Sequence, residues 1–162
     1  HRLIRRQRQM CIRDRMKGAR EVIDELKRRG IYVAIVSSGV ARFIGSIAHI
    51  LKVDDWAAND FSWDKEGYLS GPAPAMVDSH NKGEMVEKLA RINGFEAEKI
   101  WTIGDSGTDL SMQIPGSNFI GFNPARERSI NKFTDASVPI IVDKDLTKIW
   151  NIIFSEDFPK ND

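Results

Sequence analysis

The sequence has little of several features that define whole classes of protein. It contains a single cysteine, Cys11, which excludes an internal disulfide, and its Cys and His residues show no zinc-ligand spacing. No apolar run approaches the roughly 20 residues that span a bilayer, and no continuous apolar stretch of the kind found in a secretory signal follows the basic start. The 162 residues, 41% of them hydrophobic, are enough for one core. We therefore expect one cytoplasmic domain without a membrane segment.

Positive charge is concentrated at the start of the sequence, although the net charge of the whole chain is only +1. Residues 1–20 contain eight Lys and Arg residues and one acidic residue, Asp14. No aromatic residue lies among these charges, so a nucleic-acid partner is not expected. We predict that residues 1–15 are a non-native or disordered basic arm. Codons for "MCIRDR" (residues 10–15) can resemble a transposase end used in sequencing libraries, which suggests a read artefact joined to a gene fragment.

Helical and strand patterns alternate after this arm. Apolar Val22, Ile23 and Leu26 recur at helical spacing, and Gly30 follows as a stop signal. The run "IYVAIVSSG" lacks polar alternation, which predicts a parallel strand buried on both faces and ending in a polar turn at residues 37–39. A helix over residues 41–51 should follow.

The remaining patterns continue this alternation. Two short strands are predicted around a turn at residues 64–67, then a helix over residues 82–92 that Gly94 ends. "KIWTIGD", "SNFIGFN" and "VPIIVDKD" are three further apolar runs, and each precedes a helical pattern, the last two over residues 125–133 and 146–154. Strands alternating with helices predict an α/β fold with a mostly parallel sheet and right-handed crossovers.

Polar side chains with possible chemistry lie where predicted strands end. In parallel sheets, ligands bind beyond the carboxyl ends of the strands, where Ser37, Ser38 and Asp105 are expected, and Lys82 begins a helix that can reach the same edge. Hydroxyls and free N–H groups suit phosphate oxygens, and a lysine neutralises a phosphoryl group. Two aspartates four residues apart, Asp105 and Asp109, can hold a hard dication. The pattern predicts a phosphoryl-transfer site.

Each of these residues also has an ordinary structural interpretation. Ser37 and Ser38 can cap a helix, and an isolated Lys82 can simply be solvated. Asp109 can be a first-turn charge that the helix dipole stabilises, and Asp105 can be a turn residue. Only their order and placement along the chain favour a functional site.

Three segments of the sequence resemble known motifs. "AIVSSG", "NKGEMVEKLARINGF" and "IWTIGDSGTDLSM" are similar to the second, third and fourth motifs of the haloacid dehalogenase superfamily, and most of all to its phosphoserine phosphatase group. The resemblance extends over residues 16–154. It implies a Rossmann-like three-layer sandwich and a partial catalytic core domain over residues 16–162. It also implies Mg²⁺-dependent hydrolysis of a small phosphorylated metabolite, phosphoserine in serine biosynthesis.

The resemblance assigns a role to each matching residue. Lys82 corresponds to the catalytic lysine, Asp105 to the metal-binding aspartate, and Asp109 to the acidic residue that supports the metal or that lysine. Thr108 lies in the same substrate loop as Ser106, and Thr108 and Ser38 stand where phosphoserine phosphatases usually have Asn and Gly. The phosphate is expected to contact Ser37, Ser38, Gly39, Lys82 and Thr108.

The first motif of the family, D-x-D on a strand ahead of the first helix, has no counterpart. Asp14 is the only earlier acidic residue, and Met16 occupies the position two residues later. The cap region that normally follows is also missing. A D-x-D-x-T pattern does occur near the other end, at Asp143, Asp145 and Thr147. It is either a permuted nucleophile or, with Asp145 as an N-cap, the start of the last helix.

This missing strand would lie between the strands that end at Ser37 and Asp105. A basic arm cannot replace a strand buried on both faces, because its charges would be desolvated without partners. We therefore predict an exposed arm, a gap or distorted pairing at this place in the sheet, and a chain that is nearly inactive by itself. Two alternatives remain open: a related phosphatase or phosphotransferase acting on another phosphometabolite, and a non-catalytic phosphate-binding module. The oligomeric state is not predictable from these patterns.

Overall fold

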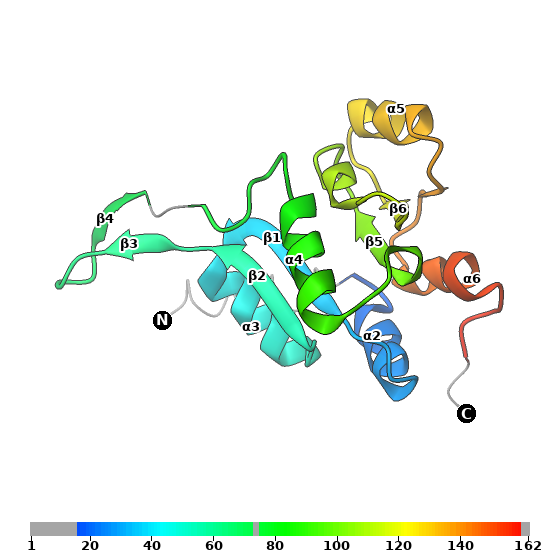
Figure 1. The fold of residues 1–162 in the computed structure, drawn as a ribbon, viewed down its shortest axis with the longest axis horizontal. Coiled ribbons are helices and arrows are strands. Elements are labelled where there is room, and N and C mark those ends of the chain that lie inside the picture. The colour runs from blue at the N-terminus through cyan, green and yellow to red at the C-terminus, as the bar shows by residue number, and fades with distance from the viewer. Residues whose placement is uncertain (1–15, 73–74, 160–162) are drawn as a thin grey trace.

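The computed structural model describes residues 16–72 and 75–159 (Figure 1). The predicted basic arm over residues 1–15 lies outside the described residues. Within the described part, none of the helices combines the length and the hydropathy that a bilayer crossing requires. The chain alternates helices with short strands, as the hydrophobic pattern predicted.

The first half of the chain forms a small parallel sheet. Helix α2 (Ala19–Arg28) is followed by β1 (Ala34–Val40), α3 (Ala41–Leu51) and β2 (Asp55–Asn59). β1 and β2 run parallel, with a register shift between Val36 and Val40. β2 was not predicted separately from the hairpin that follows it, because the run "WAAND" is too short to be distinguished from a loop.

The predicted hairpin is confirmed. β3 (Phe61–Trp63) and β4 (Leu69–Pro72) are antiparallel and project from the body of the molecule (Figure 1). The turn is closed by Asp64, whose carboxylate accepts a hydrogen bond from the Tyr68 N–H at 2.7 Å. Gly67 has φ +86°, a conformation that residues with a Cβ seldom adopt.

The second half forms a three-stranded parallel sheet in the order β5-β6-β7. Helix α4 (Gly83–Asn93) ends at Gly94 as predicted, and α5 (Glu127–Asp135) and α6 (Ile149–Phe154) match the two later helical patterns. The strands are β5 (Trp101–Gly104), β6 (Asn118–Phe122) and β7 (Ile140–Ile141). Three 3₁₀ turns complete the second half, η1 (Ala97–Lys99), η2 (Asp109–Met112) and η3 (Leu146–Lys148).

The prediction of an α-helix after β5 is wrong, because only the short 3₁₀ turn η2 is present there. Pro115 disfavours helical backbone at the residue before it, and Gly116 has φ +85°, so the chain turns back toward β6 at once.

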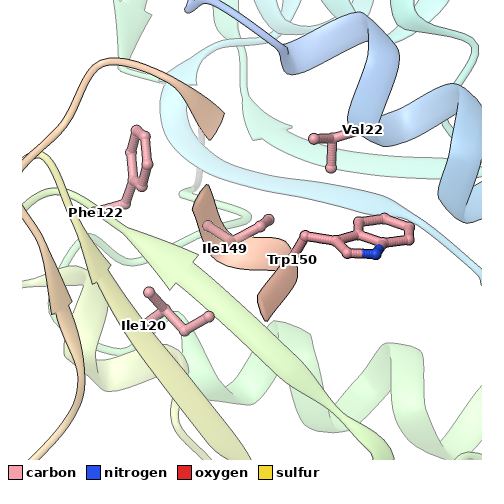
Figure 2. Close-up of a cluster of buried hydrophobic side chains, with 5 residues drawn as sticks. All are labelled: Val22, Ile120, Phe122, Ile149 and Trp150. Carbon is pink, nitrogen blue, oxygen red and sulfur yellow. The ribbon is translucent and has the colours of Figure 1, made fainter. Parts of the chain in front are cut away.

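Two hydrophobic clusters lie on opposite faces of β6. Figure 2 shows the first, where Ile120 and Phe122 of β6 meet Val22 of α2 and Ile149 and Trp150 of α6. Phe119, the residue directly before Ile120, belongs to the second cluster, with Val86, Met112 and Phe133. Because side chains alternate along a strand, α2 and α6 cover one face and α4 and α5 the other. The expected three-layer α/β fold is confirmed.

Among the described residues, β1 pairs only with β2, and β5 pairs only with β6, so the facing edges of the two sheets have no strand between them. The sequence predicted β1 to be buried on both faces, but each of its residues is partly or fully exposed. Val36 still packs against the cluster around Phe119, which connects the two halves.

The D-x-D-x-T segment forms a helix cap. Asp145 Oδ1 accepts hydrogen bonds from the Thr147 N–H at 3.1 Å and from its hydroxyl at 2.7 Å, and Asp145 Oδ2 lies 2.6 Å from Lys17 Nζ. Asp143 accepts a hydrogen bond from the Asp145 N–H. These are the local contacts expected of the capping interpretation rather than of a nucleophile.

Candidate active site

The loop that follows β5, residues 105–109, is organised around Asp109. Asp109 is buried, and its Oδ2 accepts hydrogen bonds from the Ser106 N–H at 2.9 Å and the Ser106 hydroxyl at 3.0 Å. The Ser106 and Thr108 hydroxyls are 2.7 Å apart. Asp109 therefore holds the loop in one conformation at the carboxyl end of β5.

Lys82 reaches this loop from the start of α4. Its Nζ lies 2.5 Å from Asp109 Oδ1, and both side chains are only 10% exposed. Burial alone would raise the pKa of Asp109, but the hydrogen bonds from Lys82 and Ser106 outweigh burial and hold its pKa below the usual range. Ser111 fixes the backbone at this point, because its hydroxyl accepts from the Lys82 N–H and donates to the Thr108 carbonyl.

Two glycines allow this close approach of α4 to the loop. A Cβ at Gly83 would lie 2.5 Å from the Ser111 carbonyl oxygen, and one at Gly104 would lie 2.2 Å from the Asp109 Cβ. Both distances are shorter than van der Waals contact. Side chains at these positions would push Lys82 and Asp109 apart.

Asp105 lies beside this pair at the exposed end of β5. Burial raises the pKa of the Asp105 carboxyl above its usual value, and the negative charge of Asp109 raises it further. None of the ion pairs found within residues 16–72 and 75–159 includes Asp105. A carboxylate in this position would be stabilised by a cation.

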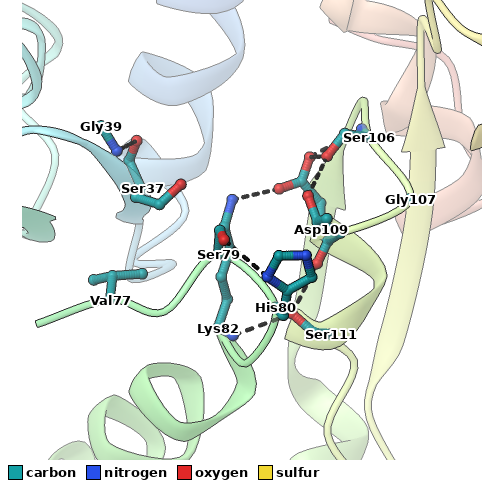
Figure 3. Close-up of polar contacts among 12 residues, drawn as sticks. Ser37, Gly39, Val77, Ser79, His80, Lys82, Ser106, Gly107, Asp109 and Ser111 are labelled. Carbon is teal, nitrogen blue, oxygen red and sulfur yellow. Dashed lines mark hydrogen bonds and ion pairs between the residues drawn. The ribbon is translucent and has the colours of Figure 1, made fainter. Parts of the chain in front are cut away.

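The sequence predicted a turn at residues 37–39, but these residues, which we call the 37–39 loop, form the irregular last part of β1, at the corresponding edge of its sheet. The Ser37 hydroxyl accepts a hydrogen bond from the Gly39 N–H at 3.0 Å, and Ser38 and Gly39 are exposed. Figure 3 shows Lys82 between this loop on one side and the Asp109 loop on the other, and Figure 1 shows α4 between the two sheets in the same way. The predicted residues therefore come from three separate segments that approach one edge of the fold.

Several residues that surround this edge were not predicted from the sequence. Asn59 bonds to the Ser38 carbonyl, and Ser111 supports Lys82. Ser129 of α5 accepts a hydrogen bond from the Gly107 N–H, which ties α5 to the 105–109 loop. His80 precedes Lys82 and contacts the Ser79 hydroxyl (Figure 3). The only feature of the sequence that could have marked Asn59 as a site residue is its position as a polar residue directly after the short apolar pair Ala57–Ala58.

The described residues contain no group of three or more His, Cys, Asp and Glu side chains that could hold a metal ion. Mg²⁺ typically binds one or two protein carboxylates and completes its octahedron with waters and substrate phosphates. Asp105 fits this requirement. Both oxygens of Asp109 already accept hydrogen bonds from Lys82 and Ser106, which suits the role of supporting the lysine.

A family model for haloacid dehalogenase-like hydrolases matches residues 1–113. The chain belongs to this family, as its motifs predicted. Phosphoserine phosphatase of Methanocaldococcus jannaschii is 40% identical over 97 residues, which are 59% of this chain and 46% of that protein. The Wolinella succinogenes phosphoserine phosphatase is 36% identical over 98 residues, or 60% and 47% of the two chains. This chain thus spans about half the length of these curated relatives.

Solved structures agree with this assignment. A substrate-bound phosphoserine phosphatase complex has a TM-score of 0.74 and 33% identity, covering 85% of this chain and 63% of the other. A phospho-aspartyl intermediate analogue of phosphoserine phosphatase has a TM-score of 0.73 and 34% identity, covering 85% and 64%. The chain therefore has the fold of the phosphoserine phosphatase group.

Proposed function

We propose that this chain forms part of a Mg²⁺-dependent phosphatase that hydrolyses a small phosphate monoester, with phosphoserine as the preferred candidate substrate. The observation that carries the proposal is the buried ion pair between Lys82 and Asp109 beside Asp105. Burying a lysine and an aspartate is costly unless both are paired and hydrogen-bonded. The pair fixes the Lys82 ammonium at the ligand-binding edge of a parallel sheet, where it can stabilise negative charge on a phosphoryl group.

Each residue has a definite task in this proposal. The Ser37 hydroxyl and the N–H groups of Ser38 and Gly39 would bind phosphate oxygens, and the Gly39 N–H would exchange its hydrogen bond to the Ser37 hydroxyl for one to phosphate. The Lys82 ammonium would stabilise charge on the transferred phosphoryl group, with its position fixed by Asp109. Thr108, in the 105–109 loop, would contribute a hydroxyl that contacts the phosphate.

Asp105 would hold the metal ion, together with waters and substrate phosphate oxygens. Mg²⁺, when bound, would neutralise negative charge on the phosphate. In this metal-binding role, Asp105 stays ionised because the dication opposes the two effects that raise its pKa.

The proposed reaction also needs a nucleophile. An aspartate of the missing first motif would attack phosphorus, and water would hydrolyse the resulting aspartyl-phosphate. The sequence contains no D-x-D ahead of its first helix. We therefore expect the chain as it stands to bind phosphate with Mg²⁺ and to show little turnover.

The test is a chimera in which the N-terminal part of the Methanocaldococcus jannaschii relative, up to the start of its match, replaces residues 1–15. This chimera should hydrolyse phosphoserine only with Mg²⁺, and Asp105→Asn should abolish the activity. Turnover that survives Asp105→Asn would refute the assigned roles.

Two alternatives predict other outcomes of the same test. Thr108 and Ser38 differ from the usual phosphoserine phosphatase residues, so a related enzyme for another phosphometabolite would hydrolyse different esters in a screen. A non-catalytic phosphate-binding module would change Trp101 fluorescence on titration with phosphate and Mg²⁺, and its chimera would show no turnover.

A further inference from the structure

Strand β1 is irregular where it meets β2. Val36 stands opposite Ala57 and Val40 opposite Asn59, so the three residues of the 37–39 loop face a single residue of β2. A bulge of this kind leaves backbone groups without ladder partners. The exposed N–H groups that would bind phosphate lie in this bulge.

The Asn59 side chain replaces a missing partner. Its Nδ2 donates a hydrogen bond to the Ser38 carbonyl at 3.2 Å and a second one to the Val77 carbonyl at 2.8 Å. Its Oδ1 accepts from the Val77 N–H at 2.8 Å. The amide therefore binds both backbone groups of Val77 as a neighbouring strand would, and at the same time holds the bulge of β1.

Val77 anchors the segment that leads to Lys82. Val77 is only 2% exposed, so it holds this segment against the fold at one point. Five residues later, Lys82 begins the approach to Asp109. Asn59 is thus the one side chain within the described residues that hydrogen-bonds both the 37–39 loop and the segment carrying Lys82.

We propose that Asn59 is a positioning residue, which holds the 37–39 loop and the Lys82 segment at the spacing that a single phosphate group needs. This inference rests on the proposed function. Asn59 does not touch the phosphate in this account. An amide is required because it is both donor and acceptor, whereas an aspartate of the same shape has no donor when ionised.

The experiment compares Asn59→Asp and Asn59→Leu with Asn118→Asp in the full chain. Asn118 is a matched control, because its Nδ2 also donates to two backbone carbonyls, those of Glu98 and Ile100, at the amino end of β6, away from the site. The probes are inorganic phosphate with Mg²⁺, measured by calorimetric titration, and the thermal unfolding midpoint.

Both Asn59 variants should bind phosphate about tenfold or more weakly than wild type. Asn118→Asp should lower the thermal unfolding midpoint by a similar amount but change the phosphate affinity less than twofold. Asn59→Leu separates positioning from charge repulsion, since it adds no negative charge. Unchanged affinity in Asn59→Leu, or equal losses in all three variants, would overturn the inference.

A measurement on the unmodified chain covers the case in which the variants do not fold. In ¹⁵N NMR spectra, the side-chain amide signals of Asn59 should shift as phosphate and Mg²⁺ are added, and those of Asn118 should not. Phosphate binding without a shift at Asn59 overturns this inference alone. A chain that binds no phosphate overturns the proposed function as well.

Discussion

At the scale of single residues, the site is built around a buried charge pair rather than around exposed polar groups. Lys82 Nζ and Asp109 Oδ1 are 2.5 Å apart, and both side chains are largely buried. Ser106 donates two hydrogen bonds to the other carboxylate oxygen of Asp109. An isolated charge there would be strongly unfavourable, but a complete pair is tolerated. The stability of the chain should therefore depend on both partners being present.

Asp109→Ala should lower the free energy of unfolding by about 3–5 kcal/mol, because it leaves the Lys82 ammonium buried and unpaired. The double variant Lys82→Met with Asp109→Leu should cost less than Asp109→Ala alone. Urea denaturation measures both. The control is Glu96→Ala, which removes an exposed pair with Lys99 and should change stability by less than about 1 kcal/mol. Equal losses in Asp109→Ala and Glu96→Ala would contradict the account.

Asp105→Asn should raise the unfolding midpoint of the metal-free chain at pH 7 slightly, because solvent screens much of the charge of this exposed carboxylate. Folding raises the pKa of Asp105, so its ionised form is disfavoured in the folded state. This penalty is absent below the unfolded pKa of about 3.9, grows as pH rises toward the higher folded pKa, and is complete above it.

The difference between wild type and Asp105→Asn should therefore disappear near pH 3 in thermal unfolding followed by circular dichroism. Adding Mg²⁺ at pH 7 should stabilise wild type but not the variant. A midpoint that falls at pH 7 in the variant would show that Asp105 is a structural residue.

At the scale of elements, the position of helix α4 determines whether Lys82 reaches the 105–109 loop. Gly83 lets the start of α4 lie against η2, where a Cβ would meet the Ser111 carbonyl oxygen at 2.5 Å. The other end of α4 is set by Gly94, whose φ of +71° ends the helix. The sequence pattern predicted that Gly94 ends this helix. It did not predict that Gly83 allows the close contact with Ser111.

Gly83→Ala should destabilise the chain by about 1–3 kcal/mol through overpacking, although alanine is the better helix former. It should also weaken phosphate binding, since α4 must move away from Ser111. Glu87→Ala, at an exposed position of the same helix, serves as control and should leave both properties nearly unchanged. Chemical denaturation together with a phosphate titration checks this, and a stabilised Gly83→Ala protein would contradict it.

Sequence patterns predicted the elements with long hydrophobic periodicity well and the short ones poorly. Helix α3 occupies the predicted residues 41–51, and the hairpin around residues 64–67 is present. β2 was missed because it is too short for a period to be visible, and a longer helix was predicted where only the 3₁₀ turn η2 is present. Lys82 and Asp109 were both selected as site residues, but their direct contact depends on packing at Gly83 and Gly104, which no local pattern reports.

At the scale of the whole molecule, the described fold consists of two parallel sheets connected by packing rather than by a shared strand. Val36 of β1 packs on the cluster around Phe119, and the ends of β1 and β5 face the same side (Figures 1 and 3). The sequence resemblance predicted a gap between these strands. Within the described residues, no strand lies between β1 and β5. Because of this arrangement, the candidate site depends on residues from three distant segments.

The central claim is that Ser37, Lys82 and Asp105 act on one phosphate. Its most direct test is the affinity of the chain for inorganic phosphate in the presence of Mg²⁺, measured by calorimetric titration for wild type and for Ser37→Ala, Lys82→Ala and Asp105→Asn. The account predicts that wild type binds and that each substitution weakens binding about tenfold or more. Binding that is unchanged in all three variants would contradict it.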